Sequence, residues 1–74
     1  MEIKVIGKRT GISKKSGKEY LQVGYLAPAV NGVGEFGDSL FLDPSEYKYE
    51  EIAIGKKYNA EFNRQGFLQS FKPL

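Results

Sequence analysis

The sequence predicts an all-β fold, a small barrel of five strands with one short helix or helical turn between the third and fourth strands. Three observations lead to this prediction. Apolar and polar residues alternate over five short segments, as in strands with one buried face. Turn residues, mainly glycine, proline and asparagine, separate these segments. The chain has 74 residues, which is the size of one domain with one small core, so residues 1–74 are expected to form a single domain.

The first two strands are predicted in residues 2–10 and 19–27. In the first, Ile3 and Val5 share one face, and Gly7 interrupts the alternation as a β-bulge would. Residues 11–18 between the strands form a hairpin tip. The second strand divides its side chains between two faces, with Leu21, Val23 and Tyr25 on one and Tyr20, Gln22, Gly24 and Leu26 on the other.

The remaining elements are predicted from the turn residues and the return of alternation. Asp43 is suited to an N-cap and Pro44 to the first position of a helix. In the last strand, Phe67 and Phe71 are expected on one face. The elements in order are a glycine-rich loop at 28–37, a third strand at 38–43, a helical segment at 44–52, and strands at 56–62 and 67–73 around a turn at 63–66.

Five strongly curved strands must close on themselves, because an open sheet would leave two edges and half a core exposed. A five-stranded barrel with a helix between strands three and four is the OB-type arrangement. The SH3-like barrel is the competing architecture, and it usually lacks a helix at this place. The segment 44–52 therefore favours the OB type.

Composition excludes several classes of function. The chain contains no cysteine and no histidine, so thiolate metal sites and histidine-dependent catalysis are ruled out. No serine lies in a nucleophile motif, and the glycine-rich loop does not match a dinucleotide fingerprint. We therefore expect no enzyme, no catalytic residues, no metal and no cofactor. No run of about 18 apolar residues is present, so we expect no membrane association and a cytoplasmic protein.

Charge is distributed unevenly along the chain. Residues 1–18 contain six basic residues and one acid, whereas residues 35–51 contain six acids and one lysine. A basic N-terminal region of this kind is suited to a polyanion. The alternative is that the opposite charges face each other across the fold and cancel.

The first hairpin combines lysines with an aromatic ring, which single-stranded nucleic acid requires for phosphate contacts and base stacking. If Leu21 and Val23 are core residues, Tyr20 points outward beside Gln22. The alternative is that Tyr20 only covers the flank of the barrel. The basic candidates for nucleic-acid contacts are Lys8, Arg9, Lys14, Lys15 and Lys18.

Two further aromatic residues are candidates for stacking. Phe41 points outward if Leu40 and Leu42 are core residues, and it points inward if the register is inverted. At the last hairpin, Arg64 and Phe67 can hold a base by stacking and cation–π contact. The alternative for that hairpin is an ordinary charged turn over a buried Phe67.

The stretch Gly17-Lys18-Glu19-Tyr20 after a basic turn resembles the single-stranded-DNA-binding, or helix-destabilising, proteins of filamentous phages. The end of the chain, residues 58–74, is similar in outline. The resemblance implies a dimeric five-stranded barrel that coats single-stranded DNA cooperatively and without sequence preference, in the replication of a phage or mobile element and in the cytoplasm of its bacterial host. Carried over by position, Lys18 and Tyr20 would contact DNA, Lys14 and Lys15 would belong to the binding wing, and Arg64 and Phe67 would form the tip of the final hairpin.

Two hypotheses follow. The first is a non-catalytic single-stranded DNA-binding domain, for which RNA is a possible second ligand and a homodimer the expected assembly. The second is a small-barrel interaction module that binds a protein through residues 35–51, with Phe41, Tyr47 and Tyr49 on its surface.

Overall fold

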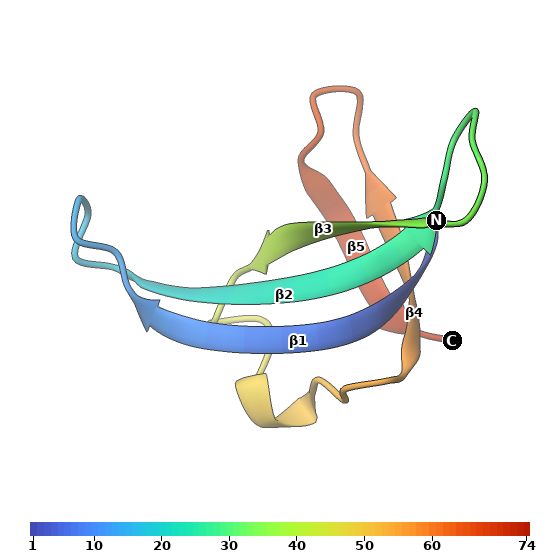
Figure 1. Ribbon diagram of the computed structural model, residues 1–74. Coiled ribbons are helices and arrows are strands. Elements are labelled where there is room, and N and C mark those ends of the chain that lie inside the picture. The colour runs from blue at the N-terminus through green and yellow to red at the C-terminus, as the bar shows by residue number, and fades with distance from the viewer.

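The computed structural model describes all residues from 1 to 74 and shows a single five-stranded antiparallel sheet. The strands curve strongly, and β4 and β5 cross behind the layer formed by β1, β2 and β3 (Figure 1). This arrangement confirms the predicted all-β class. The elements are β1 (Glu2–Ile12), β2 (Glu19–Pro28), β3 (Glu35–Leu42), the 3₁₀ turn η1 (Tyr49–Glu51), β4 (Lys57–Phe62) and β5 (Leu68–Pro73).

The order of the strands in the sheet is β3-β2-β1-β4-β5, so β1 is central and pairs with both β2 and β4. The two edge strands, β3 and β5, approach each other without forming a hydrogen-bonded ladder. The sheet is thus rolled into a partly open barrel, with its one helical turn between β3 and β4. This is the small five-stranded OB-type architecture predicted from the sequence.

The inner faces of the strands form one apolar core that contains no buried polar or charged residue. Its strand residues follow the predicted alternation through β2 and the first half of β1. The stacked rings of Tyr58 and Phe71, with centroids 4.6 Å apart, fill the side between β4 and β5. The buried residues are Ile3, Val5, Leu21, Val23, Tyr25, Leu40, Leu42, Ile52, Tyr58, Ala60 and Phe71.

A register shift between Val5 and Gly7 confirms the predicted bulge in β1. Before the bulge, Val5 points into the core. After it, Lys8 lies opposite Val23 and takes the inner side of the strand, whereas Arg9 lies opposite Gln22 on the outer side. The bulge therefore decides which of the two neighbouring cations joins the outer face.

The segment between β3 and β4 confirms the prediction of a short helix or helical turn within residues 44–52. Asp43 caps the start of a turn, because its carboxylate accepts hydrogen bonds from the backbone N–H and the hydroxyl of Ser45. Tyr47 then lies edge-on to Phe71 at the core. Only the single 3₁₀ turn η1 follows. No helix in the chain has the length and apolar character needed to cross a membrane.

Two details differ from the sequence-based expectations. β3 begins at Glu35 instead of residue 38, because the turn over residues 30–34 is tight and lets the chain pair with β2 as far as Pro28. A second bulge, between Glu61 and Phe62, shifts the start of β5. Phe67 consequently points outward and is 65% exposed, so the expectation that it shares the face of Phe71 is wrong.

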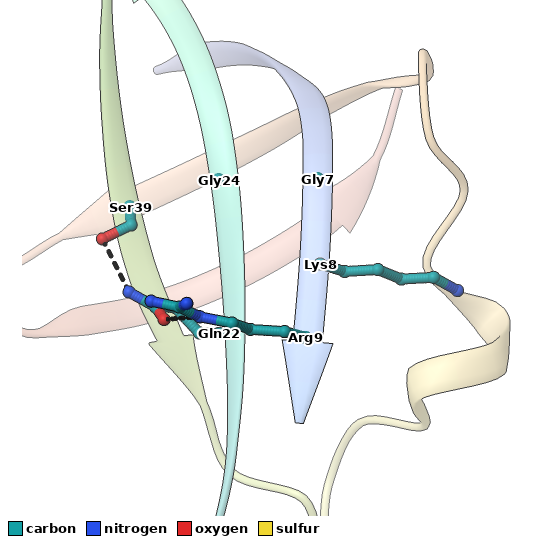
Figure 2. A pocket seen from close by; sticks show the side chains of 6 residues that line it. All are labelled: Gly7, Lys8, Arg9, Gln22, Gly24 and Ser39. Atoms are coloured by element: carbon teal, nitrogen blue, oxygen red, sulfur yellow. Dashed lines mark hydrogen bonds between the residues drawn. The ribbon is translucent and has the colours of Figure 1, made fainter. Parts of the chain in front are cut away.

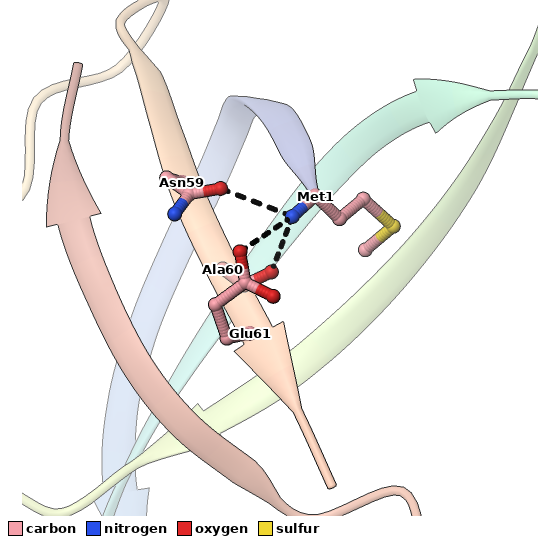
Figure 3. A network of polar contacts seen from close by, with 4 residues as sticks. All are labelled: Met1, Asn59, Ala60 and Glu61. Atoms are coloured by element: carbon pink, nitrogen blue, oxygen red, sulfur yellow. Dashed lines mark hydrogen bonds and ion pairs between the residues drawn. The ribbon is translucent and has the colours of Figure 1, made fainter.

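The N-terminus is held against β4 (Figure 3). The Met1 ammonium group donates hydrogen bonds to the Asn59 side chain, the Ala60 carbonyl and the Glu61 carboxylate, at 3.0, 2.9 and 3.1 Å. The contact with the ammonium group, followed by the Asn59 side chain, lowers the pKa of Glu61. This network fixes the beginning of β1 beside β4 on the side of the barrel away from the β1–β2 tip.

Candidate functional site

The outer face of β1, β2 and β3 carries side chains that the core does not use. The register places residues of the three strands in rows across this face. Gly11 lies opposite Tyr20 in one row. The next row contains Arg9, Gln22 and Phe41, and the one after it contains Gly7, Gly24 and Ser39. The sequence predicted Tyr20, Gln22 and Phe41 on one face, and the structure brings all three together there.

Tyr20 and Phe41 form an edge-to-face pair, with ring centroids 6.2 Å apart and planes at 75°. Phe41 is 61% exposed, which decides the register question in favour of an outward ring. The Tyr20 ring lies across the strand over Gly11, where a Cβ atom would be only 2.8 Å from the hydroxyl oxygen of Tyr20. A glycine at position 11 is thus what allows the ring to lie flat on β1.

A polar row runs beside the aromatic pair (Figure 2). Arg9 reaches across β2 and donates through Nε to Gln22 Oε1 at 2.6 Å, and Gln22 Nε2 donates to Ser39 Oγ at 3.1 Å. These side chains border a shallow depression of about 230 Å³ whose floor is formed by Gly7 and Gly24.

The β1–β2 tip presents its lysines to solvent. Backbone hydrogen bonds between Ser13 and Lys18 and between Gly17 and Ser13, each 2.8 Å long, close the turn. Lys14, Lys15 and Lys18 are exposed, and none forms an ion pair. The two ion pairs of the molecule join Met1 to Glu61 and Lys57 to Glu2, so the acids of residues 35–51 do not neutralise this tip.

The β4–β5 tip brings Phe67 to the same side as Phe41. Both rings line a depression between the end of β3 and the start of β5. The turn is held by Asn63, whose side-chain oxygen accepts hydrogen bonds from the backbone N–H groups of Gln65 and Phe67, each at 2.9 Å. Arg64 is exposed at the tip, as the sequence predicted.

Lys8 is the one basic candidate that the structure separates from the others. Its side chain extends away from Arg9, toward η1 (Figure 2). Its ammonium group donates to the Tyr49 carbonyl at 2.7 Å and lies 4.2 Å from the centre of the Tyr49 ring. Lys8 thus connects the basic strand to the acidic segment, and it is not available to a ligand on the outer face.

The aromatic residues of the alternative interaction surface are less accessible than expected. The Tyr47 ring packs against Phe71 at a centroid distance of 5.9 Å, and the Lys8 ammonium lies over one face of the Tyr49 ring, which is 37% exposed. Phe41 belongs to the outer face with Tyr20. Residues 35–51 therefore do not present these three rings as one exposed patch.

Sequence reasoning missed the residues that shape the polar row. Ser39 is unremarkable in the sequence, and only the pairing of β2 with β3 brings it to Gln22. Gly24 lies in the middle of a well-alternating strand, where glycine is unfavourable. A glycine at this unfavourable position is the feature of the sequence that could have indicated a depression in the outer face of the sheet.

No protein-family model, curated protein or solved structure matches the chain. The resemblance of residues 17–20 to phage single-stranded-DNA-binding proteins stays a prediction. No group of three or more carboxylates lies close enough together to hold a metal ion.

Proposed function

We propose that this domain is a non-catalytic single-stranded DNA-binding module that acts largely without sequence preference. One observation carries the proposal. Tyr20 and Phe41 are paired on the outer face of β2 and β3, and the neighbouring loop holds lysines with no acidic partner. Strands two and three, together with the β1–β2 and β4–β5 loops, are the surface on which OB-type barrels bind oligonucleotides.

The two parts of this surface supply different kinds of free energy. Stacking of a base on an aromatic ring contributes roughly 1–3 kcal/mol and depends little on the identity of the base. Neutralising a phosphate releases counterions and makes the affinity fall with salt. Rings at Tyr20, Phe41 and Phe67 with cations at Lys14, Lys15 and Lys18 thus suit a flexible, unpaired strand whose bases are free to stack.

The test is a fluorescence-anisotropy titration with labelled oligo-dT at several salt concentrations. We expect saturable binding that weakens steeply as salt rises. Replacing Lys14 and Lys15 together by alanine should reduce the slope of log K against log salt by about 1.4, since each single-strand phosphate contributes about 0.7. The matched control removes the same charge at Lys56 and Lys72, which lie outside the outer face of β1–β3.

Two results would contradict the proposal. One is the absence of saturable binding at the lowest salt. The other is a Lys14→Ala/Lys15→Ala variant whose affinity and salt slope equal those of the wild type. Parallel titrations with oligo-dT and oligo-U test the choice of DNA, since tighter binding of oligo-U would assign the domain to RNA.

The resemblance to phage proteins extends the proposal to biological context. It implies a homodimer that coats single-stranded DNA during replication of a phage or mobile element, in the bacterial cytoplasm. Sedimentation velocity of the protein at several concentrations tests the dimer, and the same measurement with a long oligo-dT tests cooperative coating.

A further inference from the structure

The depression on the outer face is built by two glycines that the fold itself does not require. A Cβ atom at Gly7 would meet nothing within 4 Å, and one at Gly24 would approach only the Gly7 carbonyl oxygen, at 4.0 Å. Neither residue has a positive φ, so neither backbone conformation demands glycine, even at the bulge. Glycine inside a strand weakens it and often marks a place where a ligand comes close to the backbone.

The side chains around this floor keep hydrogen-bond donors free for a ligand. A guanidinium N–H cannot accept, so the Gln22 atom facing Arg9 Nε is its carbonyl oxygen. The Gln22 amide nitrogen then faces Ser39 Oγ, which accepts from it and keeps its own proton free. The terminal nitrogens of Arg9 form no hydrogen bond or ion pair within the chain. The Arg9 guanidinium and the Ser39 hydroxyl therefore keep donors free, and none of these three side chains is negatively charged.

A site with a full positive charge, free donors, no carboxylate and no apolar wall fits an anion better than a base. Arginine holds phosphate oxygens through two parallel N–H groups, which gives both strength and direction. Gln22 lies two residues along β2 from Tyr20, a distance of about 7 Å, and directly opposite Phe41 on β3. A single DNA strand that stacks one of its bases on Tyr20 or Phe41 thus brings a neighbouring phosphate over the polar row.

We propose that the depression over Gly7 and Gly24 seats one phosphodiester group of the bound strand, held by the Arg9 guanidinium and the Ser39 hydroxyl, with Gln22 positioning both. This inference rests on the proposed function and adds to it a fixed phosphate position on the sheet. The exposed lysines of the β1–β2 tip can follow the DNA strand in several positions. The seat, in contrast, fixes the position of one phosphate relative to the rings of Tyr20 and Phe41.

The experiment fills the depression without touching the charged residues. Gly24→Val places a strand-favouring side chain in the seat, and Gly37→Val is the matched control. Gly37 is on the same outer face, and its Cβ would meet Leu26 at an ordinary 3.8 Å. We expect Gly24→Val to weaken oligo-dT binding about tenfold, as for loss of a charge-assisted hydrogen bond, and to reduce the salt slope by about 0.7. Gly37→Val should change neither quantity.

Arg9→Gln provides a second test that does not depend on the tolerance of a strand for valine. It should reduce the salt slope by the same amount, and combining it with Gly24→Val should add little, because both changes remove the same contact. Thermal unfolding of each variant shows whether the fold is kept.

The outcomes separate the seat from the proposed function. If the wild type binds and Gly24→Val and Arg9→Gln bind with unchanged slope, the seat is refuted and the single-strand function stands. If Gly24→Val weakens binding with no change of slope, the depression holds an uncharged group, and the phosphate assignment is wrong. If the wild type does not bind oligo-dT at all, the proposed function fails and the seat fails with it.

Discussion

At the scale of single residues, the position of the Tyr20 ring follows from what lies beneath it. Gly11 is directly opposite Tyr20 in the β1–β2 pair and leaves the strand bare. The ring covers this gap and meets Phe41 edge-on, so it is held by packing before any ligand arrives. A ring ordered in this way loses little conformational entropy when a base stacks on it.

Replacing Tyr20 by alanine should therefore weaken oligo-dT binding by roughly 1–3 kcal/mol while leaving the salt slope unchanged, because stacking releases no counterions. Tyr20→Phe keeps the ring and should retain near wild-type affinity. Anisotropy titrations at several salt concentrations measure both quantities. A Tyr20→Ala variant that binds as tightly as Tyr20→Phe would show that the ring does not stack on a base.

At the scale of elements, the β4–β5 tip is shaped by local hydrogen bonds and one left-handed residue. The Gly66 N–H donates to the Asn63 carbonyl at 3.0 Å, and Gly66 has a φ of 85°. This conformation closes the turn and directs Phe67 outward. A residue with a Cβ atom is strained there, and asparagine tolerates the left-handed region better than alanine does.

Gly66→Ala should lower the free energy of unfolding by about 1–2 kcal/mol, and Gly66→Asn should lower it by less. Urea unfolding of the two variants and the wild type measures the difference. Equal stability of all three proteins would mean that the left-handed turn is not maintained in solution.

Two bulges explain where prediction from the sequence failed at this scale. Alternation correctly placed Leu21, Val23 and Tyr25 in the core, and it left two registers open for Phe41, of which the structure shows the outward one. It failed for Phe67, because the register shift at Glu61/Phe62 inserts a residue that a period of two does not anticipate. It also could not decide which of the neighbours Lys8 and Arg9 lies on the outer face after the bulge near Gly7.

At the scale of the whole molecule, stability depends on a core without charges. Tyr25 is a buried core residue with an ionisable side chain. Burial, and next the negative charge of Asp38, raise its pKa above the ordinary value of 10.0. The native state thus retains the Tyr25 proton at a pH where the unfolded chain has begun to lose it.

The sign of the pH dependence follows from this difference. Above pH 10.0 the unfolded state binds fewer protons than the native state, so stability falls with rising pH until Tyr25 itself ionises. The fall is at most about 1.4 kcal/mol per pH unit for one proton. Below pH 10.0 the stabilisation that the protonated Tyr25 side chain gives to the native state is fully present.

Tyr25→Phe removes the titrating group and should flatten the alkaline decline relative to the wild type. Thermal unfolding followed between pH 8 and pH 11 compares the two proteins, which have all their other ionisable groups in common. Parallel alkaline curves for the two proteins would contradict the raised pKa of Tyr25.

The sequence by itself determined the class of fold, the number and order of the strands and the basic tip, and it named Tyr20 and Phe41 as candidates for outward rings. These features depend on local alternation and turn residues, which act over a few positions of the chain. Only the tertiary structure decided that Ser39 completes the row with Arg9 and Gln22, that Lys8 turns to η1, and that Gly7 and Gly24 meet to form one floor. These features depend on the register between strands and on bulges, which are set by long-range pairing and leave no periodic trace in the sequence.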